Sequence, residues 1–191
     1  VGLILLAVPI VSTIFYHGDF TRNGVGMAAR SLVAFSLGLL PIVMVKVLAP
    51  GYYARKNTST PVRIGVIAVV VNIVFSLLLF VPMQHVGLAA ATSIAAMVNA
   101  GLLYSGLRRE GVLIPESGWT ALLVRIGLAS MAMGILLWFG MGESSWWLDQ
   151  TVWQRVLRLT WLVPAAGFLY LVLLILLRVP LKSLLLGQQN P

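Results

Sequence analysis

Long runs of apolar residues, separated by short polar stretches, organise this chain. A helix of about 20 apolar residues crosses the hydrocarbon core of a bilayer. Six runs approach or reach that length, at residues 1–16, 27–49, 62–81, 87–107, 119–141 and 157–179. The pattern predicts an all-α fold, a polytopic transmembrane helix bundle of about six helices.

Proline and glycine mark several predicted helix ends. Pro61 directly precedes the third run and suits a first helical turn. Pro50 and Gly51 follow the second run and predict its end, because proline lacks a donor and glycine suits a left-handed cap. The chain opens at Val1 without Met and already inside an apolar run. We therefore expect it to be part of a longer protein, with a truncated first helix.

Composition and charge fit a membrane protein. Hydrophobic residues make up 60% of the 191 positions and charged residues only 9%, whereas a soluble domain carries about 25% charged residues. The net charge of +8 lies mostly between the apolar runs, a pattern typical of cytoplasmic loops and not of nucleic-acid binding. Tryptophans lie near the ends of the runs, as in the aromatic belts of membrane proteins.

The distribution of basic residues predicts the orientation of the helices. One side holds Arg55, Lys56, Arg63, Arg108, Arg109, Arg125, Arg178 and Lys182, and the other holds Arg22, Arg30, Arg155 and Arg158. Basic residues concentrate in cytoplasmic loops. We therefore expect the 50–63 loop, the 108–118 loop and the C-terminus in the cytoplasm.

Groups that could support catalysis or bind a metal are scarce. The chain has no cysteine, which excludes disulfides, thiolate nucleophiles and cysteine-ligated metals. His17 and His85 fall in predicted outer loops and have no partner at a ligand spacing. The five carboxylates lie in loops or at the ends of runs. We predict no catalytic residue, no metal site and no cofactor, and therefore no enzyme.

Lys46 is a basic residue inside a predicted span, one helical turn before Pro50. Such a residue is expensive in hydrocarbon unless it is paired or reaches water. Its ammonium group could extend along the helix to the cytoplasmic interface. Alternatively, it could line a cavity that receives an anionic headgroup. The sequence leaves both interpretations open.

A second set of polar residues lies inside the third and fourth runs. Asn72 and Ser76 are four residues apart and share a helix face, and the fourth run adds Thr92, Ser93 and Asn99. Hydrogen bonds between helices are the favoured interpretation, at about 0.6 kcal/mol per contact. The alternative is an oxygen-lined cation site formed by Asn72, Ser76 and Thr92. A scaffold that recruits partners through basic loops would not need this polar face.

One loop resembles a known family. The stretch KVLAPGYYARKNTSTPVR, residues 46–63, is similar to the cytoplasmic loop between two late helices of the MurJ (MviN) family of lipid II flippases. In that family a lysine, an APG(F/Y)YAR turn and a T-x-TPV(R/K) helix start recur. The segments FYHGDF, SLVAFSLGLLPIVMVK and GLAAATSIAAMVNAGLLY fit the same family in order and spacing.

The resemblance implies a two-lobed transporter of the MOP exporter superfamily, of which this chain is a C-terminal part. Residues 1–107 would be the last four helices of the C-terminal lobe, and 108–118 a cytoplasmic loop. Residues 119–180 would be two additional helices, and 181–191 a cytoplasmic tail. The N-terminal lobe of the same chain would be a structural partner, together with membrane lipid.

The resemblance also implies a function in the bacterial inner membrane. The family moves lipid II, an undecaprenyl-pyrophosphate-linked peptidoglycan precursor, from the inner to the outer leaflet by alternating access. Lys46, Arg55 and Arg63 match the family loop and are candidates for substrate transport, although their roles could be topological. A polysaccharide-lipid flippase or a drug/cation antiporter of the same superfamily is the alternative, but those relatives lack the APGYYAR loop.

Sodium coupling occurs in part of the family and would make Asn72 and Thr92 ligands. Sodium-binding members place a carboxylate one turn after the Asn, where this chain has Ser76. That departure argues against sodium coupling in this protein.

Overall fold

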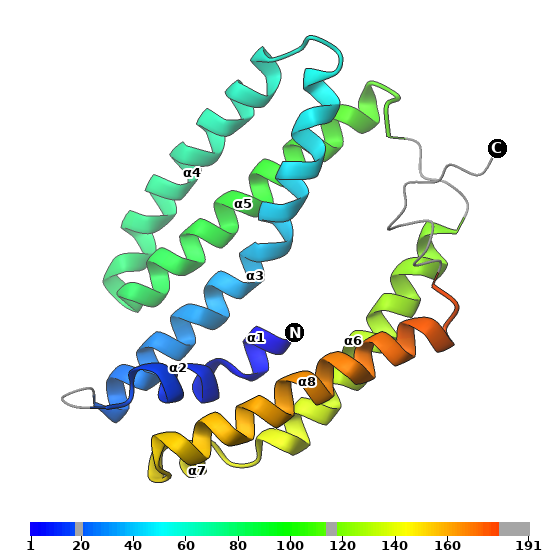
Figure 1. The fold of residues 1–191 in the computed structure, drawn as a ribbon. Coiled ribbons are helices and arrows are strands. Elements are labelled where there is room, and N and C mark those ends of the chain that lie inside the picture. The colour runs from blue at the N-terminus through cyan, green and yellow to red at the C-terminus, as the bar shows by residue number, and fades with distance from the viewer. Residues whose placement is uncertain (18–20, 114–117, 180–191) are drawn as a thin grey trace. The chain divides into compact units, whose positions relative to one another are not determined.

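Helices account for every regular element that the structure describes. The structure, a computed structural model, describes residues 1–17, 21–113 and 118–179, and within these ranges it contains no strand (Figure 1). The helices are α1 (Gly2–Leu5), α2 (Ala7–Phe15), α3 (Arg22–Tyr53), α4 (Ser59–Met83), α5 (His85–Arg109), α6 (Trp119–Met141), α7 (Ser144–Asp149) and α8 (Val152–Leu176). The predicted tail 181–191 and part of the predicted 108–118 loop lie outside the described residues.

Five of these helices, α3, α4, α5, α6 and α8, are long and apolar enough to cross a membrane. They correspond to the second to sixth predicted runs, and the predicted polytopic helix bundle is confirmed. The first run forms the two short helices α1 and α2, which meet at Leu6. Pro9 explains the break, because it has no N–H to donate to the carbonyl of Leu5 one turn earlier.

The second run forms a longer helix than predicted. Helix α3 begins after Thr21, whose Oγ1 accepts a hydrogen bond from the backbone N–H of Gly24 at 3.1 Å, a typical N-terminal cap. The prediction that Pro50 and Gly51 end the helix is wrong, because α3 continues to Tyr53. Pro50 loses only its own donor, and its carbonyl still accepts from Ala54 N at 2.9 Å.

Gly51 serves packing and not a left-handed cap. A Cβ atom at Gly51 would lie 3.3 Å from Leu107 Cδ1 on α5, so the glycine allows a close approach of the two helices. The left-handed backbone conformation falls instead on Lys56, with φ 58°, in the turn between α3 and α4.

Helices α4 and α5 form a very tight hairpin. Gln84 alone separates them and adopts φ 49°. His85, predicted to lie in a loop, is therefore the first residue of α5. Gly87 follows in the first turn, where a Cβ atom would collide with the backbone carbonyl of Leu79. The hairpin requires glycine at this position.

The chain divides into two compact units. One comprises residues 15–114, with α3, α4 and α5, and the other comprises 1–14 and 115–191, with α1, α2, α6, α7 and α8 in its described part. Residues 1–14 thus belong with the last helices. The segments 1–107 and 119–180 that the resemblance implies concern a complete transporter, and they stay a prediction.

In the unit of residues 15–114, α5 packs against both α3 and α4 (Figure 1). Small residues of α5 lie at the contacts: Ala91 is 0% exposed, and Ala95 and Ala100 are also buried. Close backbone approach through small residues is the usual way that helices associate in lipid. By contrast, large apolar side chains such as Leu77 and Val81 are exposed, as expected of surfaces that contact acyl chains.

In the other unit, α6 and α8 pack along each other. Ala129 and Leu137 of α6 are almost completely buried, as is Ala166 of α8. Gly140 lies where the two helices approach closely, since a Cβ atom there would collide with Leu162 Cδ1. Helix α6 also contacts α1, and a Cβ atom at Gly134 of α6 would lie 3.2 Å from Cγ1 of Val1, the residue before α1.

Candidate functional site

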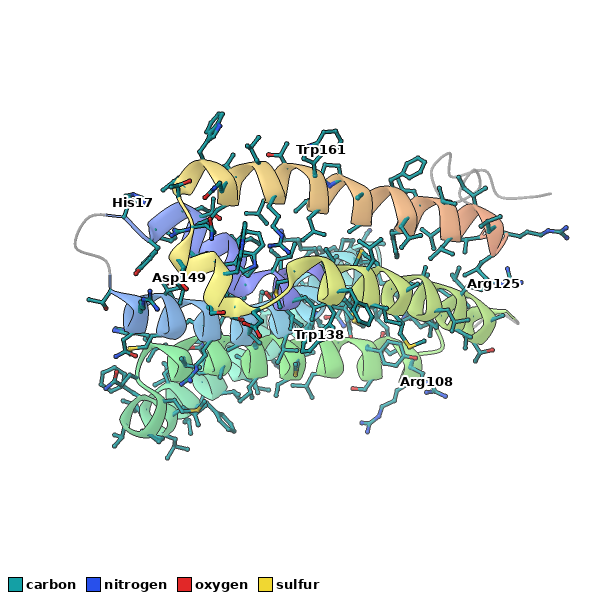
Figure 2. The ribbon with its side chains drawn as sticks, turned by 90° about the horizontal axis from the view of Figure 1, so that it is seen from below. His17, Arg108, Arg125, Trp138, Asp149 and Trp161 are labelled. Carbon is teal, nitrogen blue, oxygen red and sulfur yellow. The ribbon has the colours of Figure 1, made fainter. Side chains whose placement is uncertain are left out.

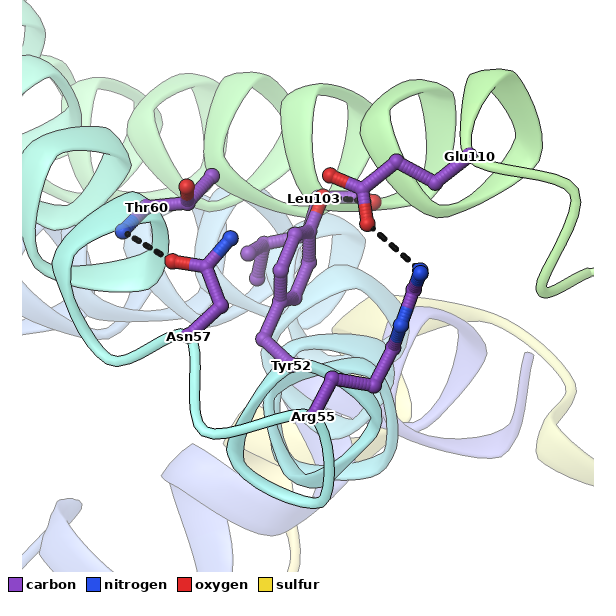
Figure 3. A network of polar contacts seen from close by, with 6 residues as sticks. All are labelled: Tyr52, Arg55, Asn57, Thr60, Leu103 and Glu110. Atoms are coloured by element: carbon purple, nitrogen blue, oxygen red, sulfur yellow. Dashed lines mark hydrogen bonds and ion pairs between the residues drawn. The ribbon is translucent and has the colours of Figure 1, made fainter.

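The loop that resembles the MurJ family lies at one end of the α3–α4–α5 unit and is held by Tyr52. This tyrosine is 0% exposed, and its hydroxyl donates a hydrogen bond to the carbonyl of Leu103 on α5 at 3.0 Å (Figure 3). Gly106 provides the space, because a Cβ atom there would collide with Tyr52 Oη. Leu48, Ile64 and Leu107 complete a small apolar core around the ring.

Arg55 links the turn after α3 to the end of α5. Its Nη1 donates to Glu110 Oε2 at 2.7 Å, and both side chains are partly exposed, at 48% and 39% (Figure 3). Backbone hydrogen bonds from Arg55 N and Asn57 N to Tyr52 O shape the same turn. Asn57 Oδ1 accepts from Thr60 N at 3.2 Å and so begins α4. Of the three predicted substrate residues, Arg55 is thus engaged by another helix.

Lys46 and Arg63 present exposed charges on the same unit. Both side chains are exposed, and neither makes a hydrogen bond or ion pair with any residue in the described ranges. Among the described residues, no hydrogen bond or ion pair joins them to each other or to Arg55.

The three predicted cation-site residues do come together between α4 and α5. Asn72 Nδ2 donates to Thr92 Oγ1 at 3.4 Å, and Ser76 Oγ donates to Asn72 Oδ1 at 3.3 Å. The Thr92 hydroxyl in turn donates to the carbonyl of Leu88 at 3.1 Å. This chain of donors and acceptors satisfies polar groups that would otherwise face hydrocarbon.

Ser93 has a role that its spacing alone did not reveal. It is 4% exposed, and its hydroxyl donates to the carbonyl of Ala34 on α3 at 2.6 Å. Gly38 lies directly opposite, where a Cβ atom would come within 2.5 Å of Ser93 Oγ. The sequence shows Gly38 in one apolar run and Ser93 in another, but nothing in the sequence indicates that these two residues are in contact.

A polar cluster in the α6–α8 unit was also missed. Arg155 is 3% exposed, and it donates to the carbonyls of Ser12, Leu148 and Gln150 at 2.9, 3.3 and 2.6 Å. In the sequence, this arginine is only a charge that indicates orientation. Carbonyl acceptors leave no pattern in the side chains, so the sequence could not predict these bonds.

Trp147 of α7 is another buried side chain of this unit with a carbonyl partner. It is 0% exposed and donates from Nε1 to the carbonyl of Met141 at 2.9 Å. Its position between the ends of α6 and α8 agrees with the predicted place near the end of a run, but its indole is buried. Trp161 and Trp138 are 79% and 62% exposed, and Trp161 extends outward from α8 (Figure 2).

Groups for metal binding are sparse in the described part of the chain. Residues 1–17, 21–113 and 118–179 contain no group of three or more His, Cys, Asp or Glu side chains placed to hold a metal ion. The oxygen atoms of Asn72, Ser76 and Thr92 are neutral, so any cation there would lack a charged ligand.

Comparison with known proteins gives consistent results. The family model for the lipid II flippase MurJ matches residues 1–157. A probable lipid II flippase MurJ of Haemophilus influenzae is 42% identical over 185 residues, which cover 97% of this chain and 36% of that protein. A probable lipid II flippase MurJ of Vibrio cholerae is 44% identical over 186 residues, 96% of this chain and 35% of that protein.

A third relative, the lipid II flippase MurJ of Burkholderia cenocepacia, is 37% identical over 139 residues, 72% of this chain and 27% of that protein. The chain thus spans about a third of the length of the first two relatives. Together with the five apolar helices, these matches identify a multi-pass protein of the bacterial inner membrane. The resemblance noted in the 46–63 loop is confirmed, and the chain belongs to the lipid II flippase MurJ family.

Proposed function

We propose that a full-length protein containing this chain moves lipid II from the inner to the outer leaflet by alternating access, and that it is a transporter and not an enzyme. The observation that carries the proposal is the family match over residues 1–157, supported by relatives that are named as lipid II flippases. The proposed partners are lipid II, membrane lipid and the remaining lobe of the same protein.

The physical chemistry of lipid II explains why such a protein needs both lipid-facing and charged surfaces. An anionic pyrophosphate and a large polar head cannot enter hydrocarbon without a large free-energy penalty. A cationic, water-filled path would lower that barrier, while the prenyl tail stays among apolar surfaces. In this chain the exposed Lys46 and Arg63 are proposed to contribute positive charge to the path. Arg55 is proposed to position the loop through Glu110.

Complementation tests this proposal. The full-length protein would be expressed in a bacterium depleted of its own lipid II flippase, and lipid II in the outer leaflet would be quantified by labelling. We expect growth to recover and outer-leaflet lipid II to return. Normal membrane insertion without either recovery would contradict the proposal.

Two further assays separate the alternative functions. A polysaccharide-lipid flippase should restore surface polysaccharide in a strain that lacks that flippase, and a drug/cation antiporter should increase the efflux of cationic dyes. We expect neither effect. Dye efflux without recovery of lipid II would favour the antiporter, and recovery of polysaccharide alone would favour the other flippase.

For Asn72, Ser76 and Thr92 we propose a linking role between α4 and α5, which the mutual hydrogen bonds support. Replacing Asn72 by Leu, Ser76 by Ala and Thr92 by Val in one protein should lower the midpoint of its thermal unfolding modestly, since such hydrogen bonds contribute about 0.6 kcal/mol each. Transport should persist when sodium is replaced by choline. Thr160→Val, which removes a hydroxyl bonded only within α8, is the matched control. Sodium-dependent transport that the triple replacement abolishes would instead establish a cation site.

A further inference from the structure

Asn99 lies deep inside α5 and makes no hydrogen bond with any described residue. At a rise of about 1.5 Å per residue, it is about 21 Å along the helix from His85 and about 15 Å from Arg109. An amide at such a depth in a membrane needs a hydrogen-bond partner. Because Asn99 is only half-buried in this chain, that partner lies outside the described residues.

Asn99 differs in this respect from comparable side chains in α3, α4 and α5. More than one turn from the helix ends, the other serines, threonines and asparagines described in these helices all bond to protein, namely Ser31, Ser36, Asn72, Ser76, Thr92, Ser93 and Ser105. These bonds satisfy their side chains within the α3–α4–α5 unit. Asn99 is therefore a polar group that this unit does not use for its own packing.

The side of α5 that carries Asn99 is polar, and the opposite side is apolar. Thr92 lies two turns before Asn99 on the same side, and it belongs to the hydrogen-bonded group with Asn72 and Ser76. The opposite side of the same stretch holds residues without a polar group in their side chains: Ile94, Met97 and Gly101. Apolar surfaces of a membrane helix face lipid, and polar ones face the protein interior or water. The Asn99 side of α5 therefore faces the interior of the full-length protein.

Asn99 also lies between the two contacts that α5 makes with its neighbours. Helix α5 packs along both α3 and α4, which hardly touch each other (Figure 1). On one side of Asn99 in the sequence, Thr92 bonds to α4. On the other side, the carbonyl of Leu103 accepts from Tyr52 of α3. The amide thus stays accessible within a unit whose other polar groups are engaged.

The chemistry of this amide suits a neutral polar group. Asparagine offers both donors and an acceptor and carries no charge, so it fits a hydroxyl or another amide. A phosphate is instead bound by arginine or lysine. The head of a peptidoglycan precursor consists of sugars and a peptide, which supply hydroxyls and amides in addition to the anionic pyrophosphate.

We propose that Asn99 contacts the sugar–peptide head of lipid II during its passage, by hydrogen bonds to a hydroxyl or amide of that head. This inference rests on the proposed function and adds a residue that recognises the head and not the pyrophosphate. It requires that Asn99 reaches water in the full-length protein and that bound lipid II covers it. A bond to another helix of the full-length protein is the alternative, and it would shield Asn99 from water.

The test measures how fast a charged thiol reagent modifies Asn99→Cys in the purified full-length protein. This chain has no cysteine of its own, and any cysteine in the rest of the protein would first be replaced by serine. Met97→Cys, on the apolar side of α5, and Val112→Cys, exposed after the end of α5, are the controls. The ligands are lipid II and undecaprenyl pyrophosphate, which has the same tail and pyrophosphate but no sugar–peptide head.

We expect the reagent to modify Asn99→Cys. With lipid II at about ten times its Kd, modification should slow about tenfold, because only about a tenth of the protein stays free. Undecaprenyl pyrophosphate should not slow it. Met97→Cys should stay unmodified, and Val112→Cys should react equally with and without lipid II. If Asn99→Cys does not fold, Ala96→Cys repeats the test one turn earlier on the same side. No modification, or modification that lipid II does not slow, would overturn the proposal.

Transport of lipid II by the same protein keeps this proposal apart from the proposed function. Asn99→Leu should slow transport about fivefold, the loss expected for one neutral hydrogen bond, and Asn99→Gln should retain part of the activity. Ser105→Ala removes a hydroxyl bonded only within α5 and should have no effect. Transport by the unchanged protein without protection of Asn99→Cys by lipid II would overturn only the role of Asn99. An unchanged protein that moves no lipid II would overturn the proposed function and this role with it.

Discussion

Lys46 is an exposed lysine within α3, four residues before Pro50. No described residue neutralises its charge, so its partner lies outside the described ranges: water, lipid, substrate or another part of the full-length protein. A snorkelling lysine would need only the interface, whereas a lysine that contacts a pyrophosphate would contribute directly to binding.

Substitution distinguishes these roles of Lys46. In the full-length protein, Lys46→Ala should lower outer-leaflet lipid II by about tenfold, the loss expected for one charge-assisted hydrogen bond. Lys46→Arg should retain part of the activity, because it keeps the charge. Lys56→Ala removes the same charge from the neighbouring turn and should have little effect. Full activity of Lys46→Ala would mean that the lysine only snorkels.

Gly38 has no side chain, and this allows α3 to approach α5 closely at Ser93. A Cβ atom there would lie 2.8 Å from Ser93 Cα, and backbone cannot move aside as the end of a side chain can. Gly26, in the same helix, has no atom within 4 Å of its corresponding Cβ position. The two glycines therefore form a matched pair.

Gly38→Ala should destabilise the full-length protein by about 1–3 kcal/mol, the usual penalty of overpacking. Gly26→Ala should be neutral or slightly stabilising, because alanine favours a helix over glycine by about 1 kcal/mol. Thermal denaturation in detergent measures the difference between the two. Equal midpoints for both variants would contradict the close contact of α3 with α5.

At the scale of the elements, the existence of the long helices could be predicted from the sequence, but some of their ends could not. Apolar length specifies a span, and α6 has the predicted bounds. Pro50 and Gly51 were misleading because a proline near the end of a helix removes only one donor, and tertiary contacts with Leu107 retain the last turn. Local signals could not show that contact.

The ends of α3 and α5 are joined by Arg55 and Glu110, a pair separated by 55 positions in the sequence. Because both side chains are partly exposed, the pair should contribute only about 0.2–1 kcal/mol. Glu110→Gln should therefore lower the thermal midpoint slightly at low salt and not at all near 1 M salt, where charges are screened within about 3 Å. Glu143→Gln removes the same charge elsewhere and is the control. A large effect that salt does not alter would contradict this description.

At the scale of the whole molecule, the chain contains two helical units with extensive apolar surfaces. Part of the candidate site was predictable: the spacing of Asn72 and Ser76 indicated one polar face, and the structure pairs that face with Thr92. The carbonyl partners of Arg155 and the contact of Gly38 with Ser93 were not predictable. They depend on which helices meet, and hydropathy does not specify that.

The share of the relatives' length that this chain spans also explains why Lys46 and Arg63 remain without partners among the described residues. The chain spans about a third of the relatives from Haemophilus influenzae and Vibrio cholerae. A transport path through a membrane needs surfaces on all sides, and a third of a transporter supplies only some of them. We therefore expect these charges to become functional only in the full-length protein.

The most direct measurement is translocation by the purified full-length protein. It would be reconstituted in vesicles with fluorescent lipid II, and an enzyme added outside would modify only the lipid II of the outer leaflet. We expect protein-containing vesicles to expose the inner pool of lipid II while a fluorescent phosphatidylglycerol stays in its leaflet. An inner pool of lipid II that stays as protected as in protein-free vesicles would contradict a role as a lipid II flippase.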